Sequence, residues 1–168
     1  MNGNLLFLQN KQEVIMPFEK ERKFLVRQEL LPRMERSIPV IQTYLSTDPG
    51  RTVRVRIAGN NAYLTIKGAP TGITRPEFEY RIPAEDAREL FRLAVSAPVE
   101  KVRHEIHVGG KKWEIDVFEG MSKGLVLAEI ELNREDEEFV LPEWAGQEVT
   151  GDWRYHNSWL SEHPFSEW

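Results

Sequence analysis

Three charged residues in an apolar setting are the first candidates for chemistry in this chain. Glu19, Glu21 and Lys23 alternate along the segment 18–27. Successive side chains of an extended strand point to opposite faces, so these three would line one face. Two carboxylates and an amine on one face either bind a ligand or lie in water, where charges protect a strand edge from unwanted pairing. The rest of the chain must distinguish these interpretations.

Charged residues recur on the polar faces of later segments. Segment 52–58 alternates Arg54 and Arg56 with apolar residues, and segment 62–67 ends on Lys67. The same alternation adds Glu77, Glu79, Lys101, Arg103, Asp116, Glu129 and Glu131. One charged face therefore runs through most of the predicted sheet.

The segments that carry these residues predict a closed sheet. Eight strands are expected at 18–27, 42–45, 52–58, 62–67, 77–82, 99–108, 111–118 and 125–132. Eight antiparallel strands suffice to close a barrel that holds one small ligand. A helix of about a dozen residues is expected from Pro83, with an apolar stripe that packs on the sheet, and a final helix is expected at 154–162. We predict an α+β fold: a closed eight-stranded antiparallel β-barrel with helices packed outside.

Closure would turn the charged faces into the lumen of the barrel. Buried ion pairs are a costly way to stabilise a fold, so a ligand is the simpler explanation for so many charges. Arginine and lysine suit phosphate oxygens, whereas carboxylates suit Mg²⁺ or Mn²⁺, which bridge to phosphate. The pattern predicts a metal–polyphosphate site.

Composition excludes several classes of protein. A chain of 168 residues fits one domain, and the absence of cysteine excludes disulfides, thiolate nucleophiles and Cys-ligated metal sites. The net charge of −5 argues against a broad nucleic-acid-binding surface. The apolar run at 5–8 is too short for a membrane span and lacks the preceding basic residue of a signal peptide. We expect a cytoplasmic protein with an extension of unknown role at residues 1–15.

These motifs, taken in order, resemble a known family. The chain is similar to the CYTH superfamily, also called triphosphate tunnel metalloenzymes, whose signature Glu-x-Glu-x-Lys corresponds to Glu19, Glu21 and Lys23. The resemblance continues through segments 54–56, 64–68, 77–80, 101–103, 128–132 and 149–152. It covers nearly everything after Met16 and is strongest to the short bacterial branch, so residues 16–168 are expected to form one such domain.

The resemblance implies roles for individual residues. It implies metal ligands or their neighbours at Glu19, Glu21, Asp116, Glu129 and Glu131. It implies phosphate-binding residues at Lys23, Arg54, Arg56, Lys67, Lys101 and Arg103. Lys23 would also be catalytic, with Tyr44 as its candidate partner, although a strand tyrosine is often only a packed ring.

Several further residues allow two interpretations each. Glu77 and Glu79 either support the metal or pair with lumen cations, and Arg75 either gates the tunnel from the loop 68–76 or faces water. Arg154 fits either a helix that closes one tunnel end or an ordinary surface helix. Lys112 and Glu114 are expected to be solvated.

The resemblance implies hydrolysis of a triphosphate with Mg²⁺ or Mn²⁺, most simply of inorganic tripolyphosphate to pyrophosphate and phosphate. The alternatives are a class IV-type adenylate cyclase, a thiamine or nucleoside triphosphatase, and, from another class, a non-catalytic module that binds polyphosphate or nucleotide. The expected partner is a small-molecule triphosphate, with no nucleic acid and no membrane. Oligomeric state and metal count stay open.

Overall fold

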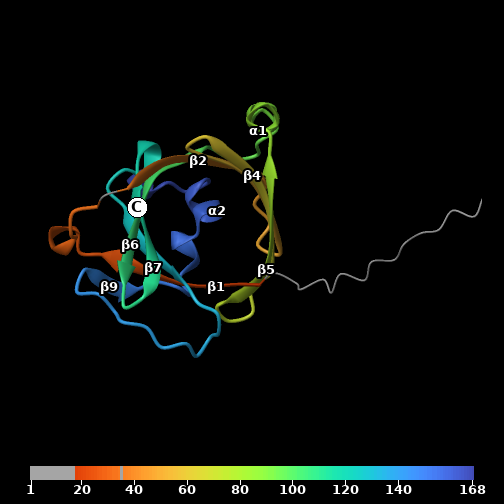
Figure 1. Ribbon diagram of the computed structural model, residues 1–168. Helices are drawn as coiled ribbons and strands as arrows, with labels where there is room; N and C mark the ends of the chain where they lie inside the picture. The colour runs from red at the N-terminus through yellow and green to blue at the C-terminus, as the bar shows by residue number, and fades with distance from the viewer. Residues whose placement is uncertain (1–17, 35) are drawn as a thin grey trace, which may run out of the picture.

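A computed structural model describes residues 18–34 and 36–168, so the predicted extension at 1–15 lies outside the described residues. Within this part the chain forms one antiparallel sheet of nine strands (Figure 1). The strands are β1 (Phe18–Val26), β2 (Ser37–Ser46), β3 (Arg51–Ala58), β4 (Asn61–Gly68), β5 (Thr74–Ile82), β6 (Val99–Val108), β7 (Lys111–Phe118), β8 (Val126–Glu131) and β9 (Ala145–Glu148). The helices are α1 (Ala84–Phe91) and α2 (Asn157–Leu160), with short 3-10 turns η1 (Gln28–Leu30), η2 (Gly120–Ser122), η3 (Trp153–Tyr155) and η4 (Phe165–Glu167).

Strand β1 closes the sheet into a barrel. Eight strands follow in the order β5-β4-β3-β2-β6-β7-β8-β1, and β1 pairs again with β5. One edge of β1 pairs with β8, where Lys23 lies opposite Glu129. Its other edge pairs with β5 at Glu19 opposite Arg75, and further along with β9 at Phe24. The predicted closed eight-stranded barrel is confirmed, and β9 is an addition that the sequence pattern did not predict.

Two tight hairpin turns fix the register of four strands. Gly59 joins β3 to β4 with a φ of 56°, and Gly109 and Gly110 join β6 to β7 with φ of 58° and 77°. Glycine adopts positive φ without the steric cost that a Cβ imposes, and such turns match the twist of the flanking strands. Each turn joins two strands that the sequence predicted next to each other, at 52–58 and 62–67 and at 99–108 and 111–118.

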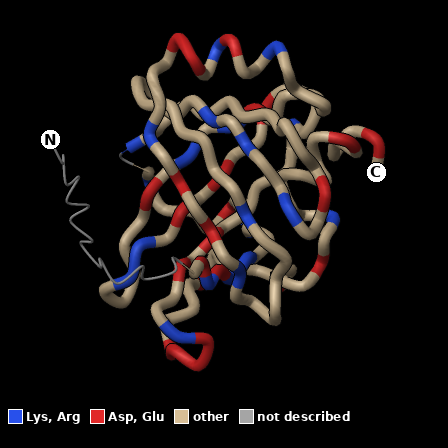
Figure 2. Tube along the Cα trace, turned by 90° about the vertical axis from the view of Figure 1, so that its right-hand side faces the viewer, with Lys and Arg blue, Asp and Glu red and all other residues tan. Residues whose placement is uncertain are grey.

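The apolar side chains of the barrel lie on its outer face. Trp113 and Ile115 of β7 are fully buried and flank Glu114, which faces the lumen. The Trp113 ring packs against Phe24 and Trp144, with centroids 5.6 Å and 5.2 Å apart. Charged residues recur along the strands with other residues between them (Figure 2). The alternation therefore sends charges inward, as expected for a barrel with apolar cover outside.

The two helices lie at different places relative to the barrel. Helix α1 packs outside β3 and β4 through Ala87, which clusters with Val55 and Ala62. The predicted C-terminal helix is instead broken at His156, whose backbone is extended, and α2 lies within the outline of the ring of strands in Figure 1. That segment departs from the expectation that the helices pack outside. In the described residues no helix is both long and apolar enough to cross a bilayer.

A candidate active site inside the barrel

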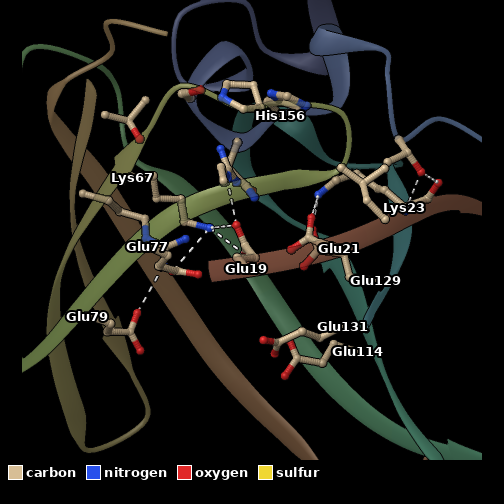
Figure 3. A pocket seen from close by; sticks show the side chains of 18 of the residues that line it. Glu19, Glu21, Lys23, Lys67, Glu77, Glu79, Glu114, Glu129, Glu131 and His156 are labelled. Atoms are coloured by element: carbon tan, nitrogen blue, oxygen red, sulfur yellow. Dashed lines mark hydrogen bonds and ion pairs between the residues drawn. The ribbon is translucent and has the colours of Figure 1, made fainter. Parts of the chain in front are cut away.

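A cavity of about 740 Å³ occupies the barrel (Figure 3). The residues predicted from the sequence that line it are Glu19, Glu21, Lys23, Tyr44, Arg54, Arg56, Lys67, Arg75, Glu77, Glu79, Arg103, Glu129 and Glu131. They come from seven of the eight barrel strands, all except β7, because period-2 alternation gives each strand one lumen-facing set. The structure thus brings together nearly all the predicted site residues.

Glu19 of β1 is bound by two cations. Lys67 Nζ lies 2.8 Å from each carboxylate oxygen, and Arg75 Nε donates to Oε2 at 2.7 Å. Burial alone would raise the pKa of Glu19, but Lys67 and Arg75 outweigh it and hold the pKa well below its usual value. Arg75 belongs to β5 and not to a loop as predicted, and its pairing with Glu19 crosses the seam that closes the barrel.

Lys23 lies between two carboxylates. Its side chain is almost fully buried, and Nζ is 2.9 Å from Glu21 Oε1 and also pairs with Glu129. Burial would lower the pKa of Lys23, but Glu129 and Glu21 reverse this and raise it above the usual value. Burial and the nearby Glu129 raise the pKa of Glu21 to about 7. One ammonium therefore does not neutralise both carboxylates.

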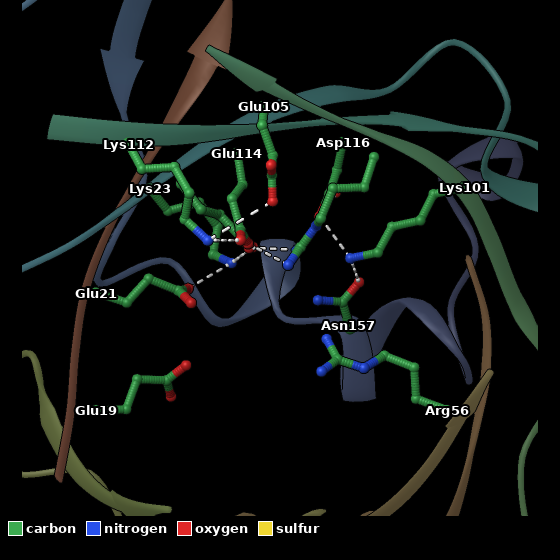
Figure 4. A network of polar contacts seen from close by, with 12 residues as sticks. Glu19, Glu21, Lys23, Arg56, Lys101, Glu105, Lys112, Glu114, Asp116 and Asn157 are labelled. Atoms are coloured by element: carbon green, nitrogen blue, oxygen red, sulfur yellow. Dashed lines mark hydrogen bonds and ion pairs between the residues drawn. The ribbon is translucent and has the colours of Figure 1, made fainter. Parts of the chain in front are cut away.

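Arg103 links three acidic residues on β7 and β8. Its Nε donates to Asp116 Oδ1 at 2.7 Å, its Nη2 donates to Glu129 Oε2 at 2.8 Å, and its Nη1 pairs with Glu114. Lys101 donates to Asp116 at 2.5 Å and to Asn157 of α2 at 3.3 Å (Figure 4). Burial would raise the pKa of Asp116, but Arg103 and Lys101 hold it below its usual value.

Lys101 and Asp116 occupy a different position from the other predicted residues. Lys101 is only 2% exposed and Asp116 is completely buried. In the described part of the chain neither contributes to the lining of the cavity. Their roles as phosphate-binding and metal-binding residues stay predictions. In the structure Asp116 accepts from Arg103, and Lys101 donates to Asp116 and Asn157.

The cations of β3 face carboxylates of β5. Arg56 Nη2 donates to both oxygens of Glu79 at 3.0 Å and 2.9 Å, and Arg54 Nη2 donates to Glu79 at 3.3 Å. Glu77 lies 3.3 Å from Lys67 and 3.8 Å from Arg54. Both glutamates therefore pair with lumen cations, which was one of the two readings of the sequence.

Two predicted residues have partners other than those expected. Tyr44 is buried in the cavity wall, and its hydroxyl accepts a hydrogen bond from Gln42 Nε2 at 3.2 Å, whereas no hydrogen bond joins it to Lys23 among the described residues. Arg154 is exposed, pairs with Asp152 and lies outside the cavity lining of the described residues. The Lys23–Tyr44 partnership stays a prediction.

Sequence reasoning missed several residues of the lumen. Glu114 and Lys112 line the cavity although they were expected to be solvated, and the alternation of Glu114 with Trp113 could have indicated this. His156 and Asn157 reach the cavity from the C-terminal segment. Burial, together with Lys23 and Arg75, lowers the pKa of His156 to about 4. The sequence held no period that would place these two residues, because the helix breaks there.

The charges that line the cavity balance. Among the described residues, seven glutamates face seven cations: Glu19, Glu21, Glu77, Glu79, Glu114, Glu129 and Glu131 against Lys23, Arg54, Arg56, Lys67, Arg75, Arg103 and Lys112. A triphosphate entering this lumen would meet repulsion from the carboxylates unless a cation accompanied it. Carboxylate oxygens are the ligands that Mg²⁺ prefers, and a divalent cation would relieve the repulsion between Glu21 and Glu129.

The donor set therefore fits a divalent metal, although the carboxylates are spread over the wall. Within residues 18–34 and 36–168 no three acidic or histidine side chains converge as a ready-made metal site. Metal binding would draw carboxylates away from the cations that they now contact. The same exchange would free lysine and arginine for phosphate.

Comparisons with known proteins agree with this geometry. The profile of the family described as CYTH domain matches residues 17–155. A protein of Acetivibrio thermocellus named inorganic triphosphatase is 43% identical over 148 residues, which are 88% of this chain and 95% of the relative. A protein of Nitrosomonas europaea with the same name is 36% identical over 148 residues, covering 85% of this chain and 96% of the relative.

A solved structure also matches. The crystal structure of the inorganic triphosphatase NE1496 aligns with a TM-score of 0.61 at 35% sequence identity, covering 85% of this chain and 93% of that one. Family profile, sequence relatives and fold agree over most of the chain. The protein belongs to the CYTH domain family.

Proposed function

We propose that this protein is a divalent-metal-dependent triphosphatase that hydrolyses inorganic tripolyphosphate to pyrophosphate and phosphate inside the barrel. The observation that carries the proposal is the cavity in which seven cations and seven glutamates of the described residues face one another. Two relatives that match most of this chain are named inorganic triphosphatase, which supports the same reaction. The substrate is a small molecule, and the composition favours action in the cytoplasm.

The cations that would bind the substrate lie on two sides of the cavity. Arg54, Arg56 and Lys67 approach from β3 and β4, and Arg103 approaches from β6. Arginine offers a fork of donors to phosphate oxygens and lysine a compact charge. Held from both sides, the triphosphate would lie across the lumen with little freedom to rotate, which favours attack along one axis.

The glutamates of β1 and β8 are the candidates to hold the metal. Glu19, Glu21, Glu129 and Glu131 line the cavity on these two neighbouring strands. The chemistry that Mg²⁺ or Mn²⁺ supplies when bound is neutralisation of charge on the phosphate oxygens and activation of water. Asp116 and Lys101 would act from behind the wall, by holding Arg103 in place.

Lys23 is placed to stabilise charge that develops in the reaction. Its ammonium is kept protonated by Glu21 and Glu129, and it faces the cavity. A fixed positive charge in a buried site stabilises a transition state more than the same charge does in water. In this role Lys23 acts as an electrostatic catalyst and phosphate ligand.

The test offers the purified protein tripolyphosphate, ATP and thiamine triphosphate, each with Mg²⁺ or Mn²⁺. Phosphate, pyrophosphate and cyclic AMP are measured as products. We expect equal amounts of phosphate and pyrophosphate from tripolyphosphate, and no activity in a chelator. Cyclic AMP with pyrophosphate as the main products from ATP would replace the proposal with adenylate cyclisation, and binding without turnover would leave a non-catalytic module.

Glu129→Gln provides the control against a contaminating phosphatase. Glu129 contacts both Lys23 and Arg103, so neutralising it removes a candidate metal ligand and disturbs two phosphate-binding cations. We expect turnover to fall about a hundredfold or more, since removing one preorganised group that stabilises transition-state charge commonly costs that much in kcat. Wild-type turnover in this variant would remove Glu129 from the site.

A further inference from the structure

Gln42 is a fully buried polar residue that the proposed function does not use. It lies on β2 two residues before Tyr44, so both side chains project from the same face of the strand. Tyr44 lines the cavity, whereas Gln42 does not appear in its lining among the described residues. Gln42 therefore lies behind the cavity lining and is connected to the cavity through Tyr44.

The hydrogen bond between the two residues has a direction. Gln42 Nε2 donates to the Tyr44 hydroxyl at 3.2 Å. A phenolic hydroxyl carries one hydrogen and can accept as well as donate, so a hydroxyl that accepts from Gln42 has its own hydrogen free for another acceptor. Among the described residues the Tyr44 hydroxyl donates no hydrogen bond, so its hydrogen is available to an oxygen in the lumen, which Tyr44 lines.

The surroundings of Tyr44 keep its hydroxyl protonated, so that it can donate a hydrogen bond. Burial raises the pKa of Tyr44 above its usual value, and the neighbouring Arg54, Arg75 and Lys23 offset this only in part. A hydroxyl that stays protonated can donate to an anionic oxygen. Arg54 lies opposite Tyr44 on β3, so such an oxygen would sit beside a phosphate-binding cation.

Gln42 is poorly explained by stability alone. Its Oε1 is buried and has no hydrogen-bond partner in the described residues. An unsatisfied buried polar atom destabilises the fold, so an apolar side chain of similar shape would serve packing at least as well. Among the described residues, the hydrogen bond that the Gln42 amide forms is the one to Tyr44, and this is the contribution that the structure shows for it.

We propose that Gln42 is a positioning residue for the proposed triphosphate hydrolysis. By donating to Tyr44, it turns the phenolic hydrogen toward a triphosphate oxygen in the lumen. Gln42 itself contacts neither substrate nor metal. The inference rests on the proposed function, and it adds a substrate contact at Tyr44 that depends on a second residue behind it.

A double-mutant cycle tests this dependence. Gln42→Met, Tyr44→Phe and the double variant are compared with wild type in kcat/KM for tripolyphosphate and in Tm. We expect Gln42→Met to lower kcat/KM roughly three- to tenfold, the worth of one neutral hydrogen bond, without lowering Tm. In the Tyr44→Phe background the same substitution should have no further effect, because the hydroxyl that it orients is gone.

Two controls separate positioning from a structural role. Gln147→Met changes an exposed glutamine on β9 and should leave both quantities as in wild type. Gln42→Leu repeats the test if the methionine variant does not fold. An equal loss of activity in both tyrosine backgrounds, or wild-type kcat/KM in Gln42→Met, overturns the inference while leaving the triphosphatase intact. Absence of hydrolysis by the wild-type protein overturns both.

Discussion

At the scale of the residue, each lumen cation already has a carboxylate partner. Lys67 shows this most clearly, since its ammonium lies 2.8 Å from Glu19 and 3.3 Å from Glu77. The pairs keep buried charges neutralised, which is the condition under which charged side chains remain inside a protein. Binding an anion then means an exchange of partners at cations that are already in place.

Replacing Lys67 should weaken substrate binding more than it slows turnover. In Lys67→Ala we expect KM for tripolyphosphate to rise about 10- to 100-fold, the worth of a charge-assisted hydrogen bond. Steady-state kinetics across a range of substrate concentrations measures the change, with the exposed Lys123→Ala as the matched control. A KM equal to that of wild type would contradict the phosphate-binding role.

His156 should make stability depend on pH in a defined window. Its pKa is lowered to about 4, mainly by burial and further by Lys23 and Arg75. Unfolded histidine titrates near pH 6.5, so between about pH 6.5 and 4 the unfolded chain binds a proton that the folded chain does not. The stabilisation is full above pH 6.5 and is lost as the pH falls.

In His156→Gln, the free energy of unfolding should therefore fall less steeply between pH 6.5 and 4 than in wild type. Urea unfolding at several pH values measures the two slopes. His107→Gln, which changes an exposed histidine of β6, is the matched control. Parallel curves for wild type and His156→Gln would show that His156 is not held neutral.

At the scale of the element, the C-terminal segment is both a wall and a part of the core. Its residues 156–158 line the cavity, while Leu160 packs with Val99, Phe118 and Leu127 of the barrel. Leu160 is thus the apolar anchor that holds polar groups at the site. The short length of α2 makes this anchoring necessary, because a single helical turn is not stable on its own.

Leu160→Ala should destabilise the protein by roughly 2–5 kcal/mol, since it deletes a fully buried side chain and leaves a cavity. Urea unfolding measures the loss, and KM should rise as residues 156–158 lose their fixed position. Leu93→Ala is the matched control, because Leu93 is 67% exposed and its truncation should change stability by less than about 0.5 kcal/mol. Equal effects of the two substitutions would refute the anchoring role.

The sequence predicted the strands far better than it predicted the C-terminal segment. Alternation of charge and apolar side chain has the period of the strand, so Arg54, Arg56 and Glu129 could be placed on a common face before any fold was known. Residues 153–160 follow no such period, because a 3-10 turn and a helical turn meet at His156. Alternation also cannot distinguish a residue that lines the cavity, such as Arg103, from one buried behind the lining on the same strand face, such as Lys101.

At the scale of the whole molecule, the balanced lumen couples the metal to the substrate. In the described part of the chain, seven lining glutamates offset seven lining cations in number, so an anion alone adds negative charge to a site without excess positive charge. A divalent cation alone must compete with lysine and arginine for the carboxylates. Each ligand would therefore improve the site for the other, which corresponds to a favourable (negative) coupling free energy.

A slowly hydrolysed imido analogue of tripolyphosphate should reveal this coupling in thermal unfolding. With Mg²⁺ and analogue together at about a hundredfold excess over Kd, we expect Tm to rise by roughly 5–10 °C. Either ligand alone, with chelator present when the analogue is tested, should raise Tm by clearly less. An equal rise with analogue in chelator would show that the cations bind the triphosphate without metal.

The double pairing of β1 also sets when the site can exist during synthesis. Lys23 and Glu129 contact each other across 106 positions of sequence, and the far edge of β1 waits for β9 at Ala145–Glu148. A chain emerging from the ribosome presents its signature strand first, yet that strand has no partner on β8 until most of the chain has followed. The nascent protein therefore carries Glu21 and Lys23 without their β8 partners until about residue 131, whereas Glu19 can pair with Arg75 as soon as β5 has followed.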